Sequence, residues 1–361
     1  MRFPEFSGEW KKKCLGDISE NISSGKTKST TTVGKYVLIG STGVIGNTSN
    51  ADYSGNLILV ARVGANAGLI NYYSGDCGIT DNTLIIKLLK QEKNFCHYVY
   101  HYLKHCNLNQ FVFGSGQPLI TGGMLKKLPI RYGTTDEINK LSSLFDLLDA
   151  RIEAQSKIIE ELTTLRSALI EKCAKQSGNF FSLSDILKEV EERSTTANQY
   201  QVLSSTVKGI FSQKEYFNKD IASEDNKGYK VVRKSHVVLS PQNLWMGNIN
   251  YNDQFDIGIV SPSYKVFSIK EGFNPIFIAA LLQTKKALNE YMLASEQGAS
   301  IVRRNLNIEA FMAIKFRIPD ARQQDSLSLA ITAINAKLNN ERCYLEQLTM
   351  QKSCLLENMF I

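Results

Sequence analysis

The feature that most constrains this chain is an internal repeat with a constant offset of 186 residues. From Leu141 onward, mostly apolar residues recur at alternating steps of four and three, and the same series starts again at Leu327. Polar residues interrupt both series at matching places, Gln155 and Arg166 in one and Glu341 and Lys352 in the other. This spacing predicts a coiled-coil seam. Its apolar members are Leu141, Phe145, Leu148, Ile152, Ile159, Leu162, Leu169, Leu327, Ile331, Ile334, Leu338, Leu345, Leu348 and Leu355.

Both series predict a long helix. A capping box marks each start, Thr134 with Glu137 and Asp320 with Gln323. Some 40 residues per helix is far beyond the usual length of about 11–12 in globular proteins. Two ordinary amphipathic helices in a globular core are the alternative, which this length disfavours. We therefore expect each helix to pack along its seam against the other copy.

Shorter similarities precede each helix, such as residues 15–18 with 183–186 and 68–72 with 247–251. Apolar runs between turn residues predict strands over 57–63, 83–88 and 231–239, and helices over 95–105 and 275–282. The predicted fold class is therefore α+β, with two globular mixed α/β domains and two long helices. The expected boundaries are a first domain at 1–133, a first helix at 134–174, a second domain at 175–319 and a second helix at 320–361.

The order of these segments predicts their geometry. The second helix must run antiparallel to the first if the two are to pack along their seams. We expect a rod with one globular head at each end and a pseudo-two-fold axis between the halves. At 1.5 Å per residue the rod is about 50–60 Å long, which matches roughly 15 base pairs of duplex.

The charge of the chain follows the same division. The formal net charge of the 361 residues is +7, which by itself is unremarkable for a globular protein. Residues 1–133 carry a net +7 and residues 175–319 a net +4, whereas the two helices carry −3 and −1. An incidental imbalance is the alternative, but basic heads on an acidic rod favour binding to a polyanion.

Polar, glycine-containing stretches of the heads supply candidate DNA-binding residues. Arg and Lys suit phosphates and guanine edges, whereas Asn and Gln suit adenine edges. The candidates are Lys26, Lys28, Lys35, Arg62, Asn66 and Gln117 in the first head, and Lys208, Lys230, Arg233, Lys234, Arg303, Arg304 and Asn305 in the second.

Catalytic motifs are weak throughout. The Gly25-Lys26-Thr27 triplet lacks the glycine that a phosphate-binding loop needs five residues earlier, where Glu20 stands. The segment starting at Asn274 resembles the catalytic tetrapeptide of amino-methylating DNA methyltransferases only faintly, since its second proline is missing. We predict no catalytic residue.

A cluster of histidines and cysteines at 96–106 is the other chemical candidate. His97, His101 and His105 lie four residues apart, a spacing that can place zinc ligands on one helix face. The intervening aromatic residues suit ordinary helix packing, there is no acidic partner as in H-E-x-x-H, and the second head has no equivalent histidines. We predict no metal site.

Two further features concern the compartment. No apolar run approaches the roughly 18 residues that a membrane-spanning helix needs, and no signal-peptide pattern follows Met1. Seven scattered cysteines suit a reducing environment. We expect a cytoplasmic protein that does not bind membranes.

Several segments resemble the specificity (S) subunits of type I restriction–modification systems. Residues 2–4, 8–10 and 15–17 are similar to the opening of these subunits, and residues 114–118 (Gly-Ser-Gly-Gln-Pro) to the stretch that closes a target recognition domain. Residues 128–130 and 316–319 resemble the strand before each long helix. The chain departs from the family at 133–137, where the Pro-rich helix start is missing, and at 298–301, where the second closing stretch is altered.

The resemblance implies a non-catalytic subunit that reads double-stranded DNA. Each head would be a target recognition domain for one half of a bipartite, asymmetric site, and the coiled coil would set the gap. Two modification subunits would carry S-adenosylmethionine and the adenine methylation, and restriction subunits would carry ATP and Mg²⁺, so this chain would bind no cofactor.

Two other classes of function stay open at this point. One is a coiled-coil interaction or scaffold protein whose basic heads bind nucleic acid non-specifically, or bind other proteins. The other is an autonomous enzyme.

Overall fold

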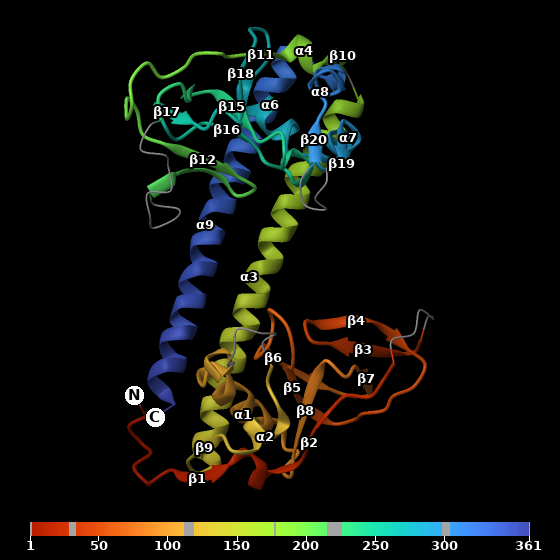
Figure 1. Cartoon of the computed structure of the whole chain (residues 1–361), viewed down its shortest axis with the longest axis vertical. Coiled ribbons are helices and arrows are strands. Elements are labelled where there is room, and N and C mark those ends of the chain that lie inside the picture. The colour runs from red at the N-terminus through yellow and green to blue at the C-terminus, as the bar shows by residue number, and fades with distance from the viewer. Residues whose placement is uncertain are drawn as a thin grey trace. The chain divides into compact units, whose positions relative to one another are not determined.

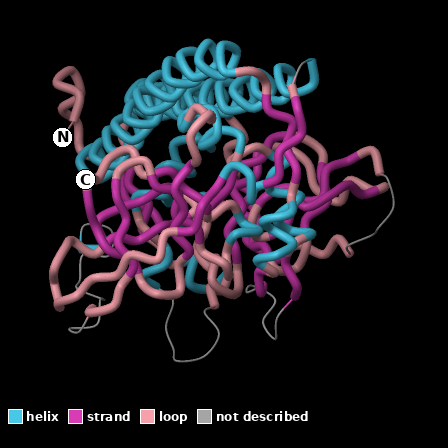
Figure 2. The backbone as a smooth tube through the Cα atoms, turned by 90° about the horizontal axis from the view of Figure 1, so that it is seen from above, coloured by secondary structure: helices cyan, strands magenta, loops and turns pink. Residues whose placement is uncertain are grey.

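The computed structural model describes residues 2–28, 34–111, 119–176, 178–214, 226–297 and 304–360. The chain divides into two compact units, the first formed by residues 1–156 with 343–361 and the second by residues 157–342. Each unit has a mixed α/β fold, and Figure 2 distinguishes its helices (cyan) from its strands (magenta). Within the described ranges no helix is long and apolar enough to cross a membrane.

The centre of the first unit is a four-stranded antiparallel sheet in the order β2-β8-β5-β6 (Figure 1). Helix α1 (Lys93–His105) contacts β5 and β6 of this sheet. A smaller sheet, β4-β3-β7, and a two-stranded pair, β1-β9, complete the unit. The bounds are β1 Lys11–Cys14, the 3-10 helix η1 Leu15–Ile18, β2 Ser19–Ser24, β3 Tyr36–Gly40, β4 Gly43–Thr48, β5 Asn56–Ala61, β6 Ile70–Ser74, β7 Cys77–Ile79, β8 Thr83–Leu88, η2 Leu108–Phe111, α2 Gly122–Lys126 and β9 Pro129–Tyr132.

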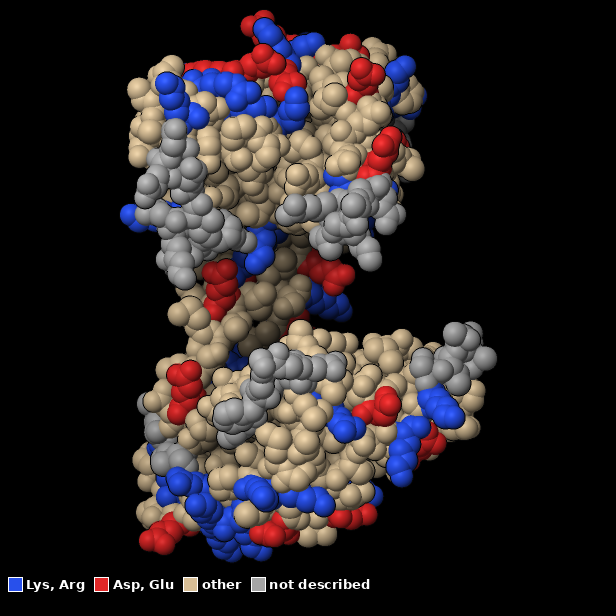
Figure 3. All heavy atoms as spheres, viewed as in Figure 1, with Lys and Arg blue, Asp and Glu red and all other residues tan. Residues whose placement is uncertain are grey.

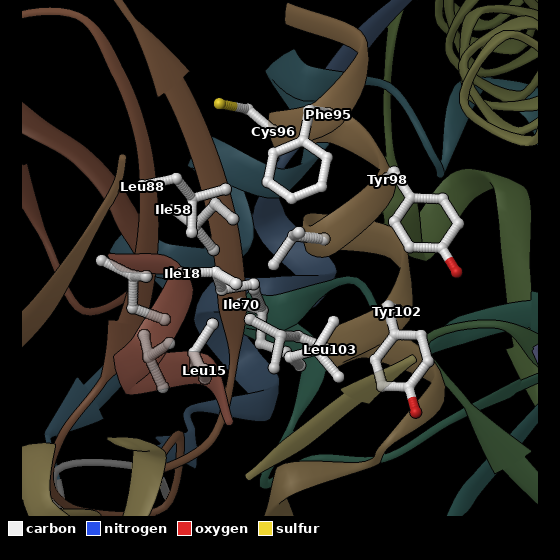
Figure 4. Close-up of a cluster of buried hydrophobic side chains, with 14 of the residues drawn as sticks. Leu15, Ile18, Ile58, Ile70, Leu88, Phe95, Cys96, Tyr98, Tyr102 and Leu103 are labelled. Atoms are coloured by element: carbon white, nitrogen blue, oxygen red, sulfur yellow. The ribbon is translucent and has the colours of Figure 1, made fainter. Parts of the chain in front are cut away.

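The core of this unit lies between α1 and the sheet. Figure 4 shows side chains from η1 and the sheet, such as Leu15 and Ile58, beside those of α1, such as Phe95 and Leu103. The apolar residues of α1 recur every three or four positions, so they share one helix face. Fully burying a side chain of this size is worth about 1.5–3 kcal/mol, so this face holds α1 on the sheet.

The second unit has a four-stranded antiparallel sheet in the order β11-β18-β15-β16. Two-stranded pairs β10-β21, β12-β13, β14-β17 and β19-β20 surround it. The bounds are β10 Asn179–Ser182, α4 Leu183–Ile186, β11 Leu187–Glu189, β12 Leu203–Thr206, β13 Gly209–Ser212, β14 Lys230–Arg233, β15 His236–Leu239, η3 Leu244–Met246, β16 Ile249–Tyr251, β17 Ile257–Val260, β18 Lys265–Ile269, α6 Pro275–Leu281, α7 Lys285–Leu293, β19 Ser295–Gln297, β20 Arg304–Leu306, α8 Ile308–Ala313 and β21 Lys315–Ile318.

The two units share a strand plan. In each, the four-stranded sheet contains strands in the same relative order, and the strand before a long helix pairs with the strand that opens the head. In both heads that opening strand leads into a short turn with an aspartate, whose carboxylate accepts a hydrogen bond from a backbone N–H three residues earlier. Asp17 does so at 3.2 Å and Asp185 at 2.7 Å. Leu15 and Leu183, which begin these turns, are both fully buried.

The prediction of one continuous strand over residues 231–239 is wrong. The run contains two strands, β14 and β15, which pair in different sheets. Lys234 and Ser235 form the turn between them, and Ser235 has a φ of 72°. Four consecutive polar residues, 233–236, lie in the middle of this run, and the prediction of one continuous strand overlooked them.

The long helices are α3 (Thr135–Gln176) and α9 (Ala321–Met359). Within the first unit their segments run antiparallel: Asp149 bonds to Lys352, whereas Arg151, later on α3, bonds to Tyr344, earlier on α9. Every apolar seam residue named above is buried or half-buried.

The helix starts show the expected N-caps. Thr134 Oγ1 accepts from the N–H of Glu137 at 3.3 Å, and Asp320 Oδ1 accepts from that of Gln323 at 2.9 Å. The side chain of Glu137 has a different role from that of a capping box. Its carboxylate accepts two hydrogen bonds from the Arg2 guanidinium, at 2.6 and 2.7 Å, and one from the Trp10 indole at 3.0 Å.

Candidate nucleic-acid interface

A groove with a volume of about 540 Å³ lies within the second unit. Its walls come from the β12–β13 hairpin, the turns beside β15 and β16, helix α6, and the segments of α3 and α9 that belong to this unit. Four basic side chains line it: Arg166 on α3, Lys208 on the hairpin, Lys234 after β14 and Arg342 on α9. Asp253 also lines the groove, so the basic residues outnumber the acidic one, and an excess of positive charge concentrates counter-ions such as phosphates.

Amide side chains line the same groove. Gln254, Gln283 and Asn339 are exposed there, and amides in such positions can read base edges through paired hydrogen bonds. Asn250 and Asn252 belong to the framework instead. Asn250 donates to Ser205 and Thr206, at 2.8 and 2.7 Å, and Asn252 donates to two backbone carbonyls and is 1% exposed.

Two arginines of the groove act on one another. Burial, and then the nearby charge of Arg342, lower the pKa of Arg166 from its ordinary value. Asn335 accepts a hydrogen bond from Arg166 at 2.8 Å and fixes the direction of the guanidinium. Like charges held together at a groove wall favour an anion between them, because an anion relieves their repulsion.

The structure separates the sequence candidates of the second head. Lys208 and Lys234 line the groove. Lys230 is 6% exposed, with its Nζ 3.8 Å from Glu189, so it is a buried residue rather than a surface contact. Arg233 is engaged by Glu192 through two hydrogen bonds, at 2.7 and 3.0 Å.

The remaining candidates of this head lie near β19 and β20. Arg304 is half-buried and donates to the carbonyl of Ser295 at 3.1 Å, which makes it a framework residue. Asn305 is exposed on β20. Arg303 lies outside the described residues.

In the first head, Lys26, Arg62 and Asn66 lie at one end of the four-stranded sheet. Lys26 follows β2 and Arg62 follows β5, and both strands end where β8 begins. Lys28 and Lys35 are exposed, and Lys35 lies 5.4 Å from the ring of Tyr36. Gln117 and the whole stretch 114–118 lie outside the described residues.

The rejected Gly25-Lys26-Thr27 triplet has a structural explanation. A Cβ at Gly25 would lie 2.3 Å from the carbonyl oxygen of Ile79, so only glycine fits beside that strand. Thr27 donates to the carboxylate of Asp52 and accepts from the N–H of Ile79. Its hydroxyl is therefore used within the fold.

Arg166 and Arg342 are not among the sequence candidates, because both lie on the long helices, which the sequence assigns to the coiled coil. A signal for Arg166 existed, since it is one of the polar residues that interrupt the seam. Arg342 has no comparable signal in the sequence.

Surface charge is mixed over both units. Figure 3 shows Lys and Arg side chains interspersed with Asp and Glu on the visible face of each. Of the described residues, one group of three side chains, His97, His101 and Asp146 of the first unit, has the spacing to hold a metal ion.

Comparison with known proteins gives consistent results. Residues 7–164 match the family described as type I restriction modification DNA specificity domain. The EcoprrI specificity subunit of a type I restriction enzyme from Escherichia coli is 23% identical over 193 residues, which cover 51% of this chain and 45% of that protein. The chain thus spans about half the length of that relative.

Two solved structures have a similar fold. The S subunit of a type I restriction–modification system from M. genitalium matches with a TM-score of 0.60 and 17% identity, covering 100% of this chain and 99% of that one. A chain from a study of complex assembly and conformational transition of the type I R-M system matches with a TM-score of 0.50 and 11% identity, covering 99% and 98%.

Proposed function

Through residues 7–164 this chain belongs to the family of type I restriction–modification DNA specificity domains, and we propose that it is a specificity subunit that reads DNA sequence and catalyses no reaction itself. The observation that carries the proposal is the groove of the second unit. There Arg166, Lys208 and Arg342 offer positive charge to phosphates, next to exposed amides that suit base edges.

We propose further that each head is a target recognition domain and that the two heads read different half-sites. The shared strand plan of the two units supports a duplicated recognition fold. Their side chains differ: helix α6 of the second unit contains no histidine, whereas α1 of the first contains His97, His101 and His105. Different side chains on one framework favour a bipartite, asymmetric site.

In this proposal the helices of residues 134–174 and 320–361 form an antiparallel coiled coil that sets the gap between the half-sites. Supporting contacts recur with the offset of the sequence repeat. Arg166 bonds to Asn335 in the second unit, and Lys352 bonds to Asp149 in the first. Each contact joins α3 to α9. The cation lies on α3 in the second unit (Arg166) and on α9 in the first (Lys352).

The proposed partners are double-stranded DNA, two modification subunits and the restriction subunits. The modification subunits would supply S-adenosylmethionine and adenine methylation, and the restriction subunits ATP- and Mg²⁺-dependent cleavage. The faintness of every catalytic motif in the sequence supports leaving the chemistry to those subunits.

The test measures binding to DNA duplexes with the modification subunits present. We expect tight binding to require two sequence elements at a fixed separation, and the adenines methylated in a co-expressing cell to lie in both elements. Equal affinity for random duplex and for single strands, with a steep salt dependence, would instead favour a non-specific coiled-coil scaffold. Insensitivity to the separation would contradict the role of the helices.

A further inference from the structure

Two helices of the first unit bring two imidazoles and a carboxylate together. His97 and His101 lie one turn apart on α1, and Asp146 faces them from α3. The carboxylate oxygens of Asp146 are 2.6 and 2.7 Å from Nδ1 of His97, and its Oδ1 is 3.1 Å from Nε2 of His101. One ligand atom from each residue lies within 4.8 Å of the other two.

The cluster is enclosed but open at one side. The side chain of His101 is 1% exposed and that of His97 15%, whereas that of Asp146 is 30% exposed. Burial lowers the pKa of His101 despite its hydrogen bond to Asp146. Burial alone would raise the pKa of Asp146, but hydrogen bonds from both histidines lower it overall. Solvent reaches the cluster from the side of Asp146, which is its most exposed member.

Neighbouring aromatic rings hold the imidazoles in place. The ring of Tyr72 meets His97 edge-on, with centroids 4.2 Å apart. Tyr100 and Phe145 lie 4.9 and 5.2 Å from the ring of His101. Ligands whose positions are already fixed lose little conformational entropy when an ion binds.

We propose that His97, His101 and Asp146 form a binding site for one divalent first-row transition ion, with zinc as the representative ion. Two histidine nitrogens and one carboxylate oxygen are a common ligand set for such ions. The exposed side of Asp146 leaves room for water to complete the coordination.

The surroundings of the cluster predict moderate rather than tight binding of an ion. Lys352, whose charge acts on His101, bonds to Asp149, so the two neutralise one another beside the cluster. The second ring nitrogens, Nε2 of His97 and Nδ1 of His101, have no hydrogen-bond partner within the described part of the chain. Because such partners strengthen a metal site, we expect micromolar affinity rather than that of a structural zinc site.

A bound ion would fasten α1 to α3 and so stabilise the first unit. The second unit offers an internal comparison, because the position 186 residues after Asp146 is Thr332 and α6 contains no histidine. The proposal therefore predicts one ion per chain, not two. It goes beyond the DNA-reading function and is independent of it, since binding is measured without DNA.

The experiment uses the full chain, free of any affinity tag and stripped of metal with a chelator. Titration with Zn²⁺ is followed by calorimetry, and titration with Co²⁺ by its visible absorption. We expect one ion per chain, a rise of several degrees in one unfolding transition, and at least a tenfold loss of affinity in Asp146→Asn and His101→Ala. His236→Ala, which changes a histidine of the second unit, is the matched control.

Absence of stoichiometric binding to the unaltered chain would overturn the proposal and leave a hydrogen-bonded cluster. Equal affinity in the unaltered chain and in Asp146→Asn would also overturn it. If His101→Ala fails to fold, His97→Ala tests the same site, because His97 lies at its more exposed side.

Discussion

The guanidinium of Arg166 on α3 donates a hydrogen bond to the side-chain oxygen of Asn335 on α9, 2.8 Å away. The residues 186 positions from each, Lys352 and Asp149, make the corresponding contact in the other unit. One of the two polar positions that interrupt the predicted seams, Arg166 in one series and Lys352 in the other, is therefore paired across the helices in each unit. Polar pairs at a seam fix its register at some cost in stability.

The Arg166–Asn335 pair should matter for stability only when it is broken on one side. We expect Asn335→Ala to lower the free energy of unfolding by about 1–3 kcal/mol, because it leaves the half-buried guanidinium without its acceptor. The double substitution Arg166→Leu with Asn335→Leu should be neutral or stabilising, as is common when a buried polar pair is replaced by apolar residues.

Urea unfolding of Arg166→Leu, of Asn335→Leu and of the double variant gives the coupling energy of the pair. Asn340→Ala, at an exposed position on the same helix, is the control and should change the unfolding free energy little. Additive effects of the two single substitutions would show that the contact contributes nothing.

Phe360, the residue that follows α9, anchors the end of that helix to the first head. Phe360 is 3% exposed, and its ring stacks on Phe145 and meets Tyr98 and Tyr102 edge-on, with centroids 5.4 Å apart in each case. We expect Phe360→Ala to destabilise the first unit by about 3–5 kcal/mol, the usual cost of truncating a buried phenylalanine. Thermal unfolding measures the effect.

Met350 supplies the comparison, because it lies on the same helix and is 72% exposed. Met350→Ala should leave the transition unchanged. If both substitutions had equal small effects, the packing of Phe360 would not hold the helix.

The sequence predicted the fold best where a periodic apolar pattern corresponds to a buried helix face. The heptad spacing located both long helices to within a few residues, and the apolar face of α1 was visible in its spacing. The same reasoning failed for 231–239, where the polar residues 233–236 contain a two-residue turn between strands of different sheets. Local signals predict local structure, and a change of sheet is not local.

Contacts between residues that lie far apart in the sequence could not be predicted from it. The carboxylate of Glu137 looked like part of a capping box, yet it binds Arg2 and Trp10, more than 120 residues away in sequence. Lys230 looked like a surface cation, yet it lies beside Glu189 in the interior. Asp146 could not be assigned to the histidines of α1, because the partner came from another helix.

Cysteine reactivity should follow the burial of the thiols. Burial raises the pKa of Cys77 and of Cys96 to about 11 in each case, whereas Cys14, Cys343 and Cys354 are exposed. The thiolate is the reactive form, so at pH 8 only about a thousandth of each buried thiol is ionised. We expect a thiol reagent to label the exposed cysteines first, and Cys77 and Cys96 only after unfolding.

Peptide mapping by mass spectrometry after labelling measures the order of reaction. Raising the pH from 7 to 9 should not bring Cys77 or Cys96 to the rate of the exposed thiols, because access as well as ionisation is limited. Rapid labelling of Cys96 in the folded chain would contradict its place in the core.

The basic residues of the groove should control the salt dependence of DNA binding. Each phosphate contact contributes about 0.9 to the slope of log K against log salt. We expect Lys208→Gln and Arg342→Gln each to reduce that slope by about one and to weaken binding similarly for all sequences. Lys286→Gln, at an exposed position on α7 outside the groove, should leave the slope unchanged.

The spacing of the two half-sites should depend on the length of the long helices. Removing four residues from both α3 and α9 shortens each by about 6 Å, while it keeps the two seams matched. If the helices set the gap, the preferred separation should fall by about one to two base pairs, at about 3.4 Å per pair. Sequencing of methylated adenines in cells that also express the modification subunit measures the gap. Removing four residues from only one helix should abolish methylation, because the two seams no longer align. An unchanged gap after the matched deletion would contradict the proposed role of the coiled coil.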